Sequence, residues 1–222
     1  MAFYNGIEIV RQFSLGTCKV RVAQVEPLGQ PGKLDEALRL LSLERRDKTL
    51  RYRFERGKWL SAGAGLLLDS MLSEHGLRER DMQLVIGNHG KPMLATHPEL
   101  HFNLSHSGTL VACAMGDRPV GVDVQTIVEA RRSLINYIMS SEEIAALDAT
   151  TTDLERRHLF TQLWTLKESY AKATGNGLSH EFPSFSIDST GTIKPLKPLT
   201  PPAAFKTVTL GGSIVTVAVL NR

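Results

Sequence analysis

The sequence predicts an α+β fold with largely antiparallel sheets. Strand-like segments follow one another without a helix between each consecutive pair, which argues against a doubly wound parallel sheet. Helical segments instead gather in two places, ahead of and behind a β-rich stretch that ends near residue 125. The 222 residues suffice for two domains of about 100 residues. We therefore predict an N-terminal α+β half, 1–125, and a C-terminal α+β half, 126–222.

The first half is predicted from alternation, turn residues and helical periodicity. Apolar and polar residues alternate in the first strand, two prolines and two glycines mark the turn after it, and spaced leucines indicate the helices. The short GDRP link suggests a hairpin between the last two strands. In order, we expect a strand at 17–25, a turn at 26–32, helices at 33–54 and 58–75, and strands at 82–87, 101–105, 109–116 and 119–124.

The second half starts with a helix signal. Ser141 is predicted to be an N-cap, with Glu142 and Glu143 in the first turn, where carboxylates are favourable. A long helix follows and stops at Gly175, and a proline-rich loop interrupts the strands behind it. We expect a helix at 153–173, strands at 182–188, 205–210 and 213–220, and a loop at 194–202.

Composition limits the classes of function. The net charge of +3 fits an acidic ligand or partner, but it is too small to indicate nucleic-acid binding, and no basic stripe is interleaved with aromatics. Cys18 and Cys113 form no metal-binding spacing and suggest reduced, buried thiols. With no signal-peptide pattern and no run of about 18 apolar residues, we expect a cytoplasmic protein.

The segment GVDVQ, residues 121–125, is the first candidate site. Side chains alternate along a strand, so Asp123 and Gln125 share one face while Val122 and Val124 take the other. A carboxylate and an amide oxygen side by side suit a hard cation. An aspartate that merely caps a loop at a strand end explains the same segment.

The long helix carries the second candidate, because Trp164, Glu168 and Lys172 are spaced by four and share a face. A surface Glu–Lys pair on an amphipathic helix is the structural alternative.

Ser105 and His106 form a third candidate. They lie where a strand enters a turn, and His106 suits a phosphate. Neighbours on a strand point to opposite faces, which opposes a hydrolase with a direct Ser–His relay.

Two basic segments are candidate phosphate ligands. Lys91 lies beside Pro92 in the turn GKP, and residues 51–58, RYRFERGK, carry four cations. A solvated loop lysine and a solvated helix end are the structural alternatives.

Four of these segments together resemble the Sfp-type 4′-phosphopantetheinyl transferases. GKP (90–92), FNLSHS (102–107), GVDVQ (121–125) and W-x-x-K-E-x-x-x-K (164–172) match the family forms GKP, FNxSHS, G(I/V)D(I/V)E and (W/F)xxKExxxK in order and spacing. Each segment alone is weakly specific, and their joint order is strongly specific. The resemblance implies two similar, pseudo-symmetric α+β halves that bind coenzyme A between them.

The resemblance also implies roles for individual residues. Asp123 and Glu168 would bind Mg²⁺, or Mn²⁺ in its place, and Asp123, Glu168 and Lys172 would form the catalytic group. Gln125 departs from the family pattern, which has Glu at this position. It would ligate through its amide, be replaced by water, or leave a weaker metal site.

Coenzyme A itself would be held by the basic and polar residues of the matched segments. Ser105 and His106 would hold its 3′-phosphate or pyrophosphate, and Lys91 and Pro92 would line the adenine pocket. Lys167 would anchor the helix or the phosphates, and Arg53 or Lys58 would reach the 3′-phosphate.

The implied reaction moves 4′-phosphopantetheine from coenzyme A to a serine of an acidic acyl or peptidyl carrier protein and releases 3′,5′-ADP. We expect a monomer, because one chain supplies both halves of the site. The carrier, whether for fatty acids, polyketides or nonribosomal peptides, stays open. A non-catalytic relative that binds coenzyme A or carrier proteins is the alternative, and Gln125 is its support.

Overall fold

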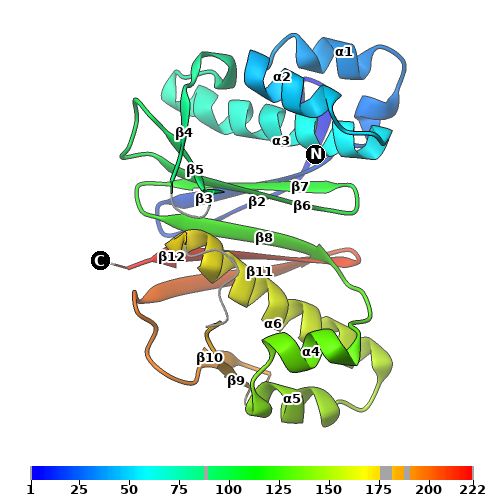
Figure 1. Cartoon of the computed structure of the whole chain (residues 1–222), viewed down its shortest axis with the longest axis vertical. Coiled ribbons are helices and arrows are strands. Elements are labelled where there is room, and N and C mark those ends of the chain that lie inside the picture. Colours follow the sequence, from blue (N-terminus) through cyan, green and yellow to red (C-terminus); the bar gives the residue numbers. More distant parts are fainter. Residues whose placement is uncertain (1, 88–89, 176–181, 188–190, 222) are drawn as a thin grey trace.

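A five-stranded antiparallel sheet occupies the first half of the chain (Figure 1). The computed structural model describes residues 2–87, 90–175, 182–187 and 191–221. The strands lie in the order β1–β2–β3–β7–β6, and α3 (Glu55–Leu72) packs on one face over a large apolar core. The strand bounds are β1 Ala2–Tyr4, β2 Ile7–Leu15, β3 Cys18–Gln24, β6 His101–Ser107 and β7 Leu110–Gly116.

A three-stranded antiparallel sheet belongs to the second half. Its order is β11–β12–β8, with bounds β8 Val120–Thr126, β11 Ala203–Leu210 and β12 Ser213–Leu220. The inward faces of the two sheets form a second core rich in valine, and α6 (Asp153–Thr174) covers the other face of β8 and β12. The layers therefore run α3, five-stranded sheet, three-stranded sheet, α6 (Figure 1).

Shorter elements surround these layers. Helices α4 and α5 pack beside α6 over a third core, and the ribbon of β9 and β10 closes it. Helices α1 and α2 lie against α3, and β4 pairs with β5. Their bounds are α1 Lys33–Leu38, α2 Leu43–Leu50, α4 Arg132–Ile138, α5 Ser141–Asp148, β4 Leu84–Ile86, β5 Pro92–Leu94, β9 Phe185–Ile187 and β10 Ile193–Pro195.

The two sheets are joined by side chains of β6 that reach the free edge of β8. Three alternate residues of β6 each accept a hydrogen bond from a backbone N–H of β8. The pairs are Asn103 Oδ1 with Val122 N at 2.9 Å, Ser105 Oγ with Val124 N at 3.2 Å, and Ser107 Oγ with Thr126 N at 3.1 Å. This ladder explains the polar alternation in FNLSHS and holds β8 in register against the first sheet.

The structure confirms the predicted α+β class with antiparallel sheets and most predicted elements. The single helix predicted over 33–54 is wrong, because the chain forms α1 and α2, and Ser42 caps the second by accepting a hydrogen bond from Arg45 N. Strands β1 and β2 were not predicted. The predicted loop at 194–202 begins inside β10. The strand predicted to end at residue 188 is present as β9, and residue 188 lies outside the described residues.

Two further predictions are corrected. The GDRP link does not form a hairpin, because β7 pairs with β3 and β6 whereas β8 pairs with β12. The link instead carries the chain from one sheet to the other. The N-cap of α5 is Ser140, not Ser141, because Ser140 and Glu143 exchange hydrogen bonds in a capping box.

The change of sheet falls between β7 and β8, a few residues before the predicted division after residue 125. That division stays a prediction, because sheet membership alone does not define a folding unit. Cys18 and Cys113 are buried and unpaired, as expected. Across the described ranges, no helix is both long and apolar enough to cross a membrane.

Candidate functional site

Asp123 is a buried carboxylate on the face of β8 that meets α6. Its Oδ1 accepts hydrogen bonds from Lys172 Nζ at 2.6 Å and from Ser105 Oγ at 2.9 Å. Its Oδ2 is buried and has no hydrogen-bond partner among the described residues. Only 5% of Asp123 is exposed, so this second oxygen lacks both a protein donor and free access to bulk water.

Glu168 and Lys172 lie one turn apart on α6 and face the same site. Glu168 Oε1 is a second buried oxygen that no donor in the described chain satisfies. Lys172 Nζ contacts Ser105 Oγ at 3.1 Å and the Val122 carbonyl oxygen at 3.3 Å, in addition to Asp123. The structure thus brings together Asp123, Glu168 and Lys172, which the resemblance places in one group, and adds Ser105 to them.

The charges of this group are not balanced. Burial raises the pKa of Asp123, and the nearby Lys172 ammonium opposes that shift. Burial also raises the pKa of Glu168, and the negative charge of Asp123 raises it further, so the two carboxylates lie close enough to repel. Among the described residues, Lys172 is the one lysine that offsets the negative charge of both Asp123 and Glu168. An additional cation between the two carboxylates would stabilise both of them.

The donor set fits a hard divalent cation. Asp123 Oδ2 and Glu168 Oε1 are carboxylate oxygens without hydrogen-bond partners among the described residues. Mg²⁺ prefers oxygen ligands, commonly one or two carboxylates, with water and substrate oxygens completing its coordination. Gln125 lies on the same face of β8 as Asp123 and is half-buried, and its amide forms no hydrogen bond with a described residue. These residues are compatible with a magnesium site that has two acidic ligands and leaves the third position neutral.

A glycine sets the distance between β8 and α6. A Cβ on Gly121 would lie 2.0 Å from the Ser169 carbonyl oxygen and 2.4 Å from Ala173 N, far inside van der Waals contact. Because residue 121 has no side chain, the helix backbone packs directly on the strand. This close approach places Glu168 and Lys172 within reach of Asp123.

A polar cavity of about 300 Å³ lies between α2 and strand β6, and both cations and the acids Glu44 and Glu79 line it. Arg45, Lys48, Pro92 and His106 are among its lining residues. Burial lowers the pKa of His106, and the charges of Lys172 and Lys48 lower it further. His106 therefore lies between the carboxylate group and the cations of α2, and connects the two parts of the site.

The cations that line this cavity are not the two predicted ones. Arg53 lies over the Phe54 ring at 5.5 Å, and Lys58 pairs with Glu55 at 2.6 Å in the first turn of α3. Neither residue lines the cavity; Arg45 and Lys48, which the sequence analysis missed, occupy that role. Their spacing of three in LERRDK places them on one face of a helix that starts at Leu43, so a correct helix boundary would have indicated them.

Two other predicted lysines have protein partners. Lys91 Nζ donates to the carbonyl oxygens of Val120 and Ala173, both at 3.0 Å, while the neighbouring Pro92 lines the cavity. Lys167 is 1% exposed and binds Glu143 at 3.0 Å and the Pro183 carbonyl oxygen at 2.6 Å. Lys91 joins β8 to the end of α6, and Lys167 ties α6 to α5, away from Asp123.

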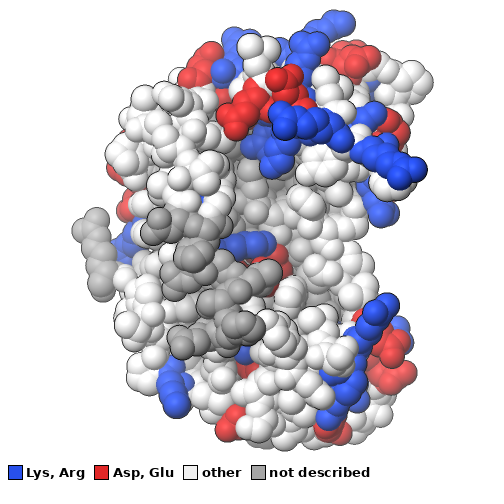
Figure 2. Space-filling view, in the orientation of Figure 1, with Lys and Arg blue, Asp and Glu red and all other residues white. Residues whose placement is uncertain are grey.

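The surface view shows a hollow between the two halves of the chain, with basic and acidic side chains inside it (Figure 2).

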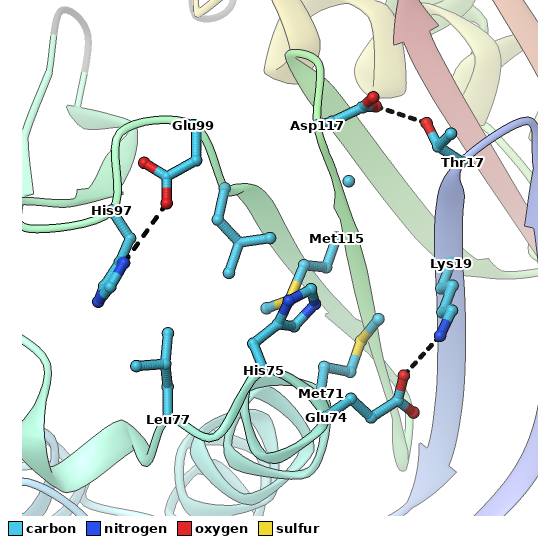
Figure 3. A pocket seen from close by; sticks show the side chains of 12 residues that line it. Thr17, Lys19, Met71, Glu74, His75, Leu77, His97, Glu99, Met115 and Asp117 are labelled. Carbon is cyan, nitrogen blue, oxygen red and sulfur yellow. Dashed lines mark hydrogen bonds and ion pairs between the residues drawn. The ribbon is translucent and has the colours of Figure 1, made fainter.

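A separate cavity of about 540 Å³ lies in the first half, beside the end of α3 (Figure 3). Met71 and Met115 form part of its apolar lining, and His97 pairs with Glu99 at its rim. It contains none of the predicted site residues.

Comparisons with known proteins assign the family. Residues 119–218 match the profile of the 4′-phosphopantetheinyl transferase superfamily, and residues 29–117 match that of the 4′-phosphopantetheinyl transferase N-terminal region. The 4′-phosphopantetheinyl transferase of Bacillus subtilis is 31% identical over 70% of this chain and 70% of its own length. Sfp of Bacillus subtilis is 31% identical over 72% and 71%, and HetI of Nostoc sp. is 30% identical over 80% and 77%. On these matches, the chain belongs to the 4′-phosphopantetheinyl transferase superfamily.

Proposed function

We propose that this chain transfers the 4′-phosphopantetheine group of coenzyme A to a serine of an apo carrier protein and releases 3′,5′-ADP. The observation that carries the proposal is the pair of buried carboxylate oxygens, Asp123 Oδ2 and Glu168 Oε1, that no described donor satisfies. They lie beside Lys172, and His106 lies between this group and the cations Arg45 and Lys48. A nucleotide substrate with separate 3′-phosphate and pyrophosphate groups suits this arrangement.

In the proposed complex, the cavity beside His106 takes the adenosine end of coenzyme A. Arg45 and Lys48 would bind the 3′-phosphate, because Lys48 is exposed and forms no ion pair with a described residue. Pro92 would contact the adenine, and Ser105 and His106 would lie toward the pyrophosphate. The predicted roles of Arg53 and Lys58 then pass to Arg45 and Lys48.

The chemical step forms one bond and breaks one. The serine oxygen of the carrier attacks the phosphorus that bears the pantetheine arm, and the bond from this phosphorus to the oxygen of 3′,5′-ADP breaks. Glu168 accepts the serine proton, directly or through a water, which its raised pKa favours. Lys172 offsets the negative charge that develops on the phosphoryl group and on the leaving group.

Asp123 and Glu168 would hold Mg²⁺ or Mn²⁺, with Gln125 or a water as a further oxygen ligand. The bound metal would neutralise charge on the pyrophosphate. The partner would be an acidic acyl or peptidyl carrier protein, consistent with the net charge of +3. A monomer suffices for this reaction, because the described site draws on both halves of one chain.

Mass spectrometry of an apo carrier incubated with the protein, coenzyme A and Mg²⁺ tests the proposal. We expect a gain of one phosphopantetheine mass, which Glu168→Gln and Asp123→Asn abolish. Asp153→Asn, which changes an exposed acid in the first turn of α6, is the matched control and should keep full transfer. If coenzyme A binds but several carriers gain no mass, the non-catalytic binding protein becomes the better assignment.

A further inference from the structure

Glu79 is a buried acid outside the proposed reaction, and its contacts lead to the cavity that would bind the 3′-phosphate. It is 2% exposed and follows α3 in a short turn over residues 79–81. Its Oε2 accepts a hydrogen bond from Ser42 N at 2.8 Å, and its Oε1 accepts from Ser42 Oγ at 3.1 Å. Glu79 therefore fixes the residue that caps the N-terminus of α2.

The same carboxylate holds Arg45. Glu79 Oε1 lies 3.4 Å from Arg45 Nε, and the Arg45 side chain is only 11% exposed. The two terminal guanidinium nitrogens of Arg45 form no hydrogen bond with any described residue. An arginine held through Nε retains its two terminal nitrogens for a second anion, in the geometry that suits a phosphate.

Glu79 is in turn held in position by Asp69 of α3. Its backbone N–H donates to Asp69 Oδ1 at 2.8 Å, and Asp69 is fully buried in α3. Asp69 Oδ2 also accepts from Tyr4 Oη at 2.7 Å and pairs with Arg78 at 2.7 Å. The support of Arg45 thus extends from the core of the first half to the wall of the cavity.

We propose that Glu79 is a positioning residue that sets the selectivity of this protein for ligands with a 3′-phosphate. This inference rests on the proposed function, because it takes the cavity of Arg45 and Lys48 to be the 3′-phosphate site. Glu79 is itself among the residues that line the cavity, but its carboxylate oxygens accept from Ser42 and Arg45, and as an anion it offers no donor to a phosphate. It restricts the rotation of Arg45 and the position of α2, so that the phosphate meets donors that are already in place.

The amide variant isolates this role. In Glu79→Gln, one side-chain position changes from an acceptor to a donor, and that donor faces either Arg45 Nε–H or Ser42 N–H. The glutamine side chain keeps the shape of the glutamate, while the hydrogen bond to Arg45 or to the cap of α2 is lost. Glu143→Gln is the matched control, because Glu143 is 0% exposed and caps α5 in the other half.

Calorimetric titration with adenosine 3′,5′-bisphosphate and with 5′-AMP measures the selectivity without any transfer reaction. We expect the wild type and Glu143→Gln to prefer the bisphosphate, and Glu79→Gln to lose about tenfold of that preference while its affinity for 5′-AMP is unchanged. A Glu79→Gln variant that keeps the full preference overturns the inference alone. A wild type without any preference overturns the proposed phosphate cavity as well.

A second variant keeps the test decisive if Glu79→Gln does not fold. Arg45→Lys retains the charge but has one ammonium, which cannot both contact Glu79 and point into the cavity. We expect it to lose the preference to a similar extent, and the double variant to lose little more, because both changes break one coupled unit. Full preference in Arg45→Lys, or additive losses in the double variant, would contradict the role of Glu79.

Discussion

At the scale of single residues, the carboxylates of Asp123 and Glu168 oppose stability while they prepare the site. Both pKa values are raised, with burial as the largest cause, so the folded chain retains protons that the unfolded chain has released. Their contribution to the free energy of unfolding is therefore favourable below the ordinary carboxyl pKa and is lost as the pH rises through the folded pKa. At neutral pH, the two carboxylates therefore lower the free energy of unfolding.

The first prediction follows from this cost. In a metal-free buffer at pH 7, Glu168→Gln should raise the free energy of unfolding by about 1 kcal/mol, because it removes a charge that is half-buried and repelled by Asp123. Urea denaturation of the variant, the wild type and the control Asp153→Asn measures the change. A less stable Glu168→Gln would contradict the charge balance described above.

The neutral Gln125 leads to the second prediction. Gln125→Glu places a third acid on the face of β8 that carries Asp123, so the Mg²⁺ concentration for half-maximal transfer should fall, by about tenfold, while activity is kept. A magnesium titration of carrier modification measures it, with thermal stabilisation by MgCl₂ as a readout independent of transfer. A clear loss of activity in the variant would show that the site requires a neutral residue.

At the scale of elements, the contact between β8 and α6 depends on Gly121. Gly121→Ala should lower the free energy of unfolding by about 3 kcal/mol, because the added methyl group meets the backbone of α6, which cannot move without shifting the whole helix. Gly212→Ala is the matched control, since a Cβ there has no atom within 4 Å. Equal stability of the two variants in urea denaturation would show that α6 adjusts freely.

Lys91, which links β8 to the end of α6, gives a prediction about pH. Burial lowers the pKa of Lys91 to about 8, so between this value and the ordinary lysine pKa near 10.4 the unfolded chain binds more protons than the folded chain. Stability contributed by Lys91 therefore increases as the pH rises. The wild type should gain stability relative to Lys91→Met between pH 7.5 and 9.5, by at most about 1 kcal/mol per pH unit. A constant difference in urea denaturation would argue against a buried ammonium.

The sequence predicts elements well where helical periodicity dominates, as in α6, or where a nearly continuous apolar run marks a buried strand, as in β12. It fails where tertiary contacts decide. A cap at Ser42 splits one leucine-rich segment into α1 and α2, and Arg45 and Lys48 of α2, rather than Arg53 and Lys58, line the cavity beside His106. The contact of Asp123 with Lys172 was accessible from the matched segments, whereas the support of Arg45 by Glu79 spans 34 residues and follows no local pattern.

At the scale of the whole molecule, the two halves depend on each other through the valine-rich core between the sheets. Sequence alone suggested a hairpin across GDRP, because a short link between two strands is a local signal, whereas the choice of partner strand depends on contacts distant in the sequence. Each half taken alone would expose one apolar sheet face to water.

The last prediction concerns this mutual dependence. A fragment of residues 1–118 should self-associate when expressed alone, and coexpression with residues 119–222 should restore a 1:1 complex. Size-exclusion chromatography with light scattering distinguishes the two outcomes. A monomeric, stably folded fragment would show that the first half is an independent domain.

The side-chain ladder between β6 and β8 also has a consequence for solubility. A strand at the margin of a sheet offers unpaired N–H groups that other chains can use for intermolecular pairing. Asn103, Ser105 and Ser107 occupy these groups along β8. The polar residues of FNLSHS thus leave these N–H groups of β8 unavailable for pairing with another chain.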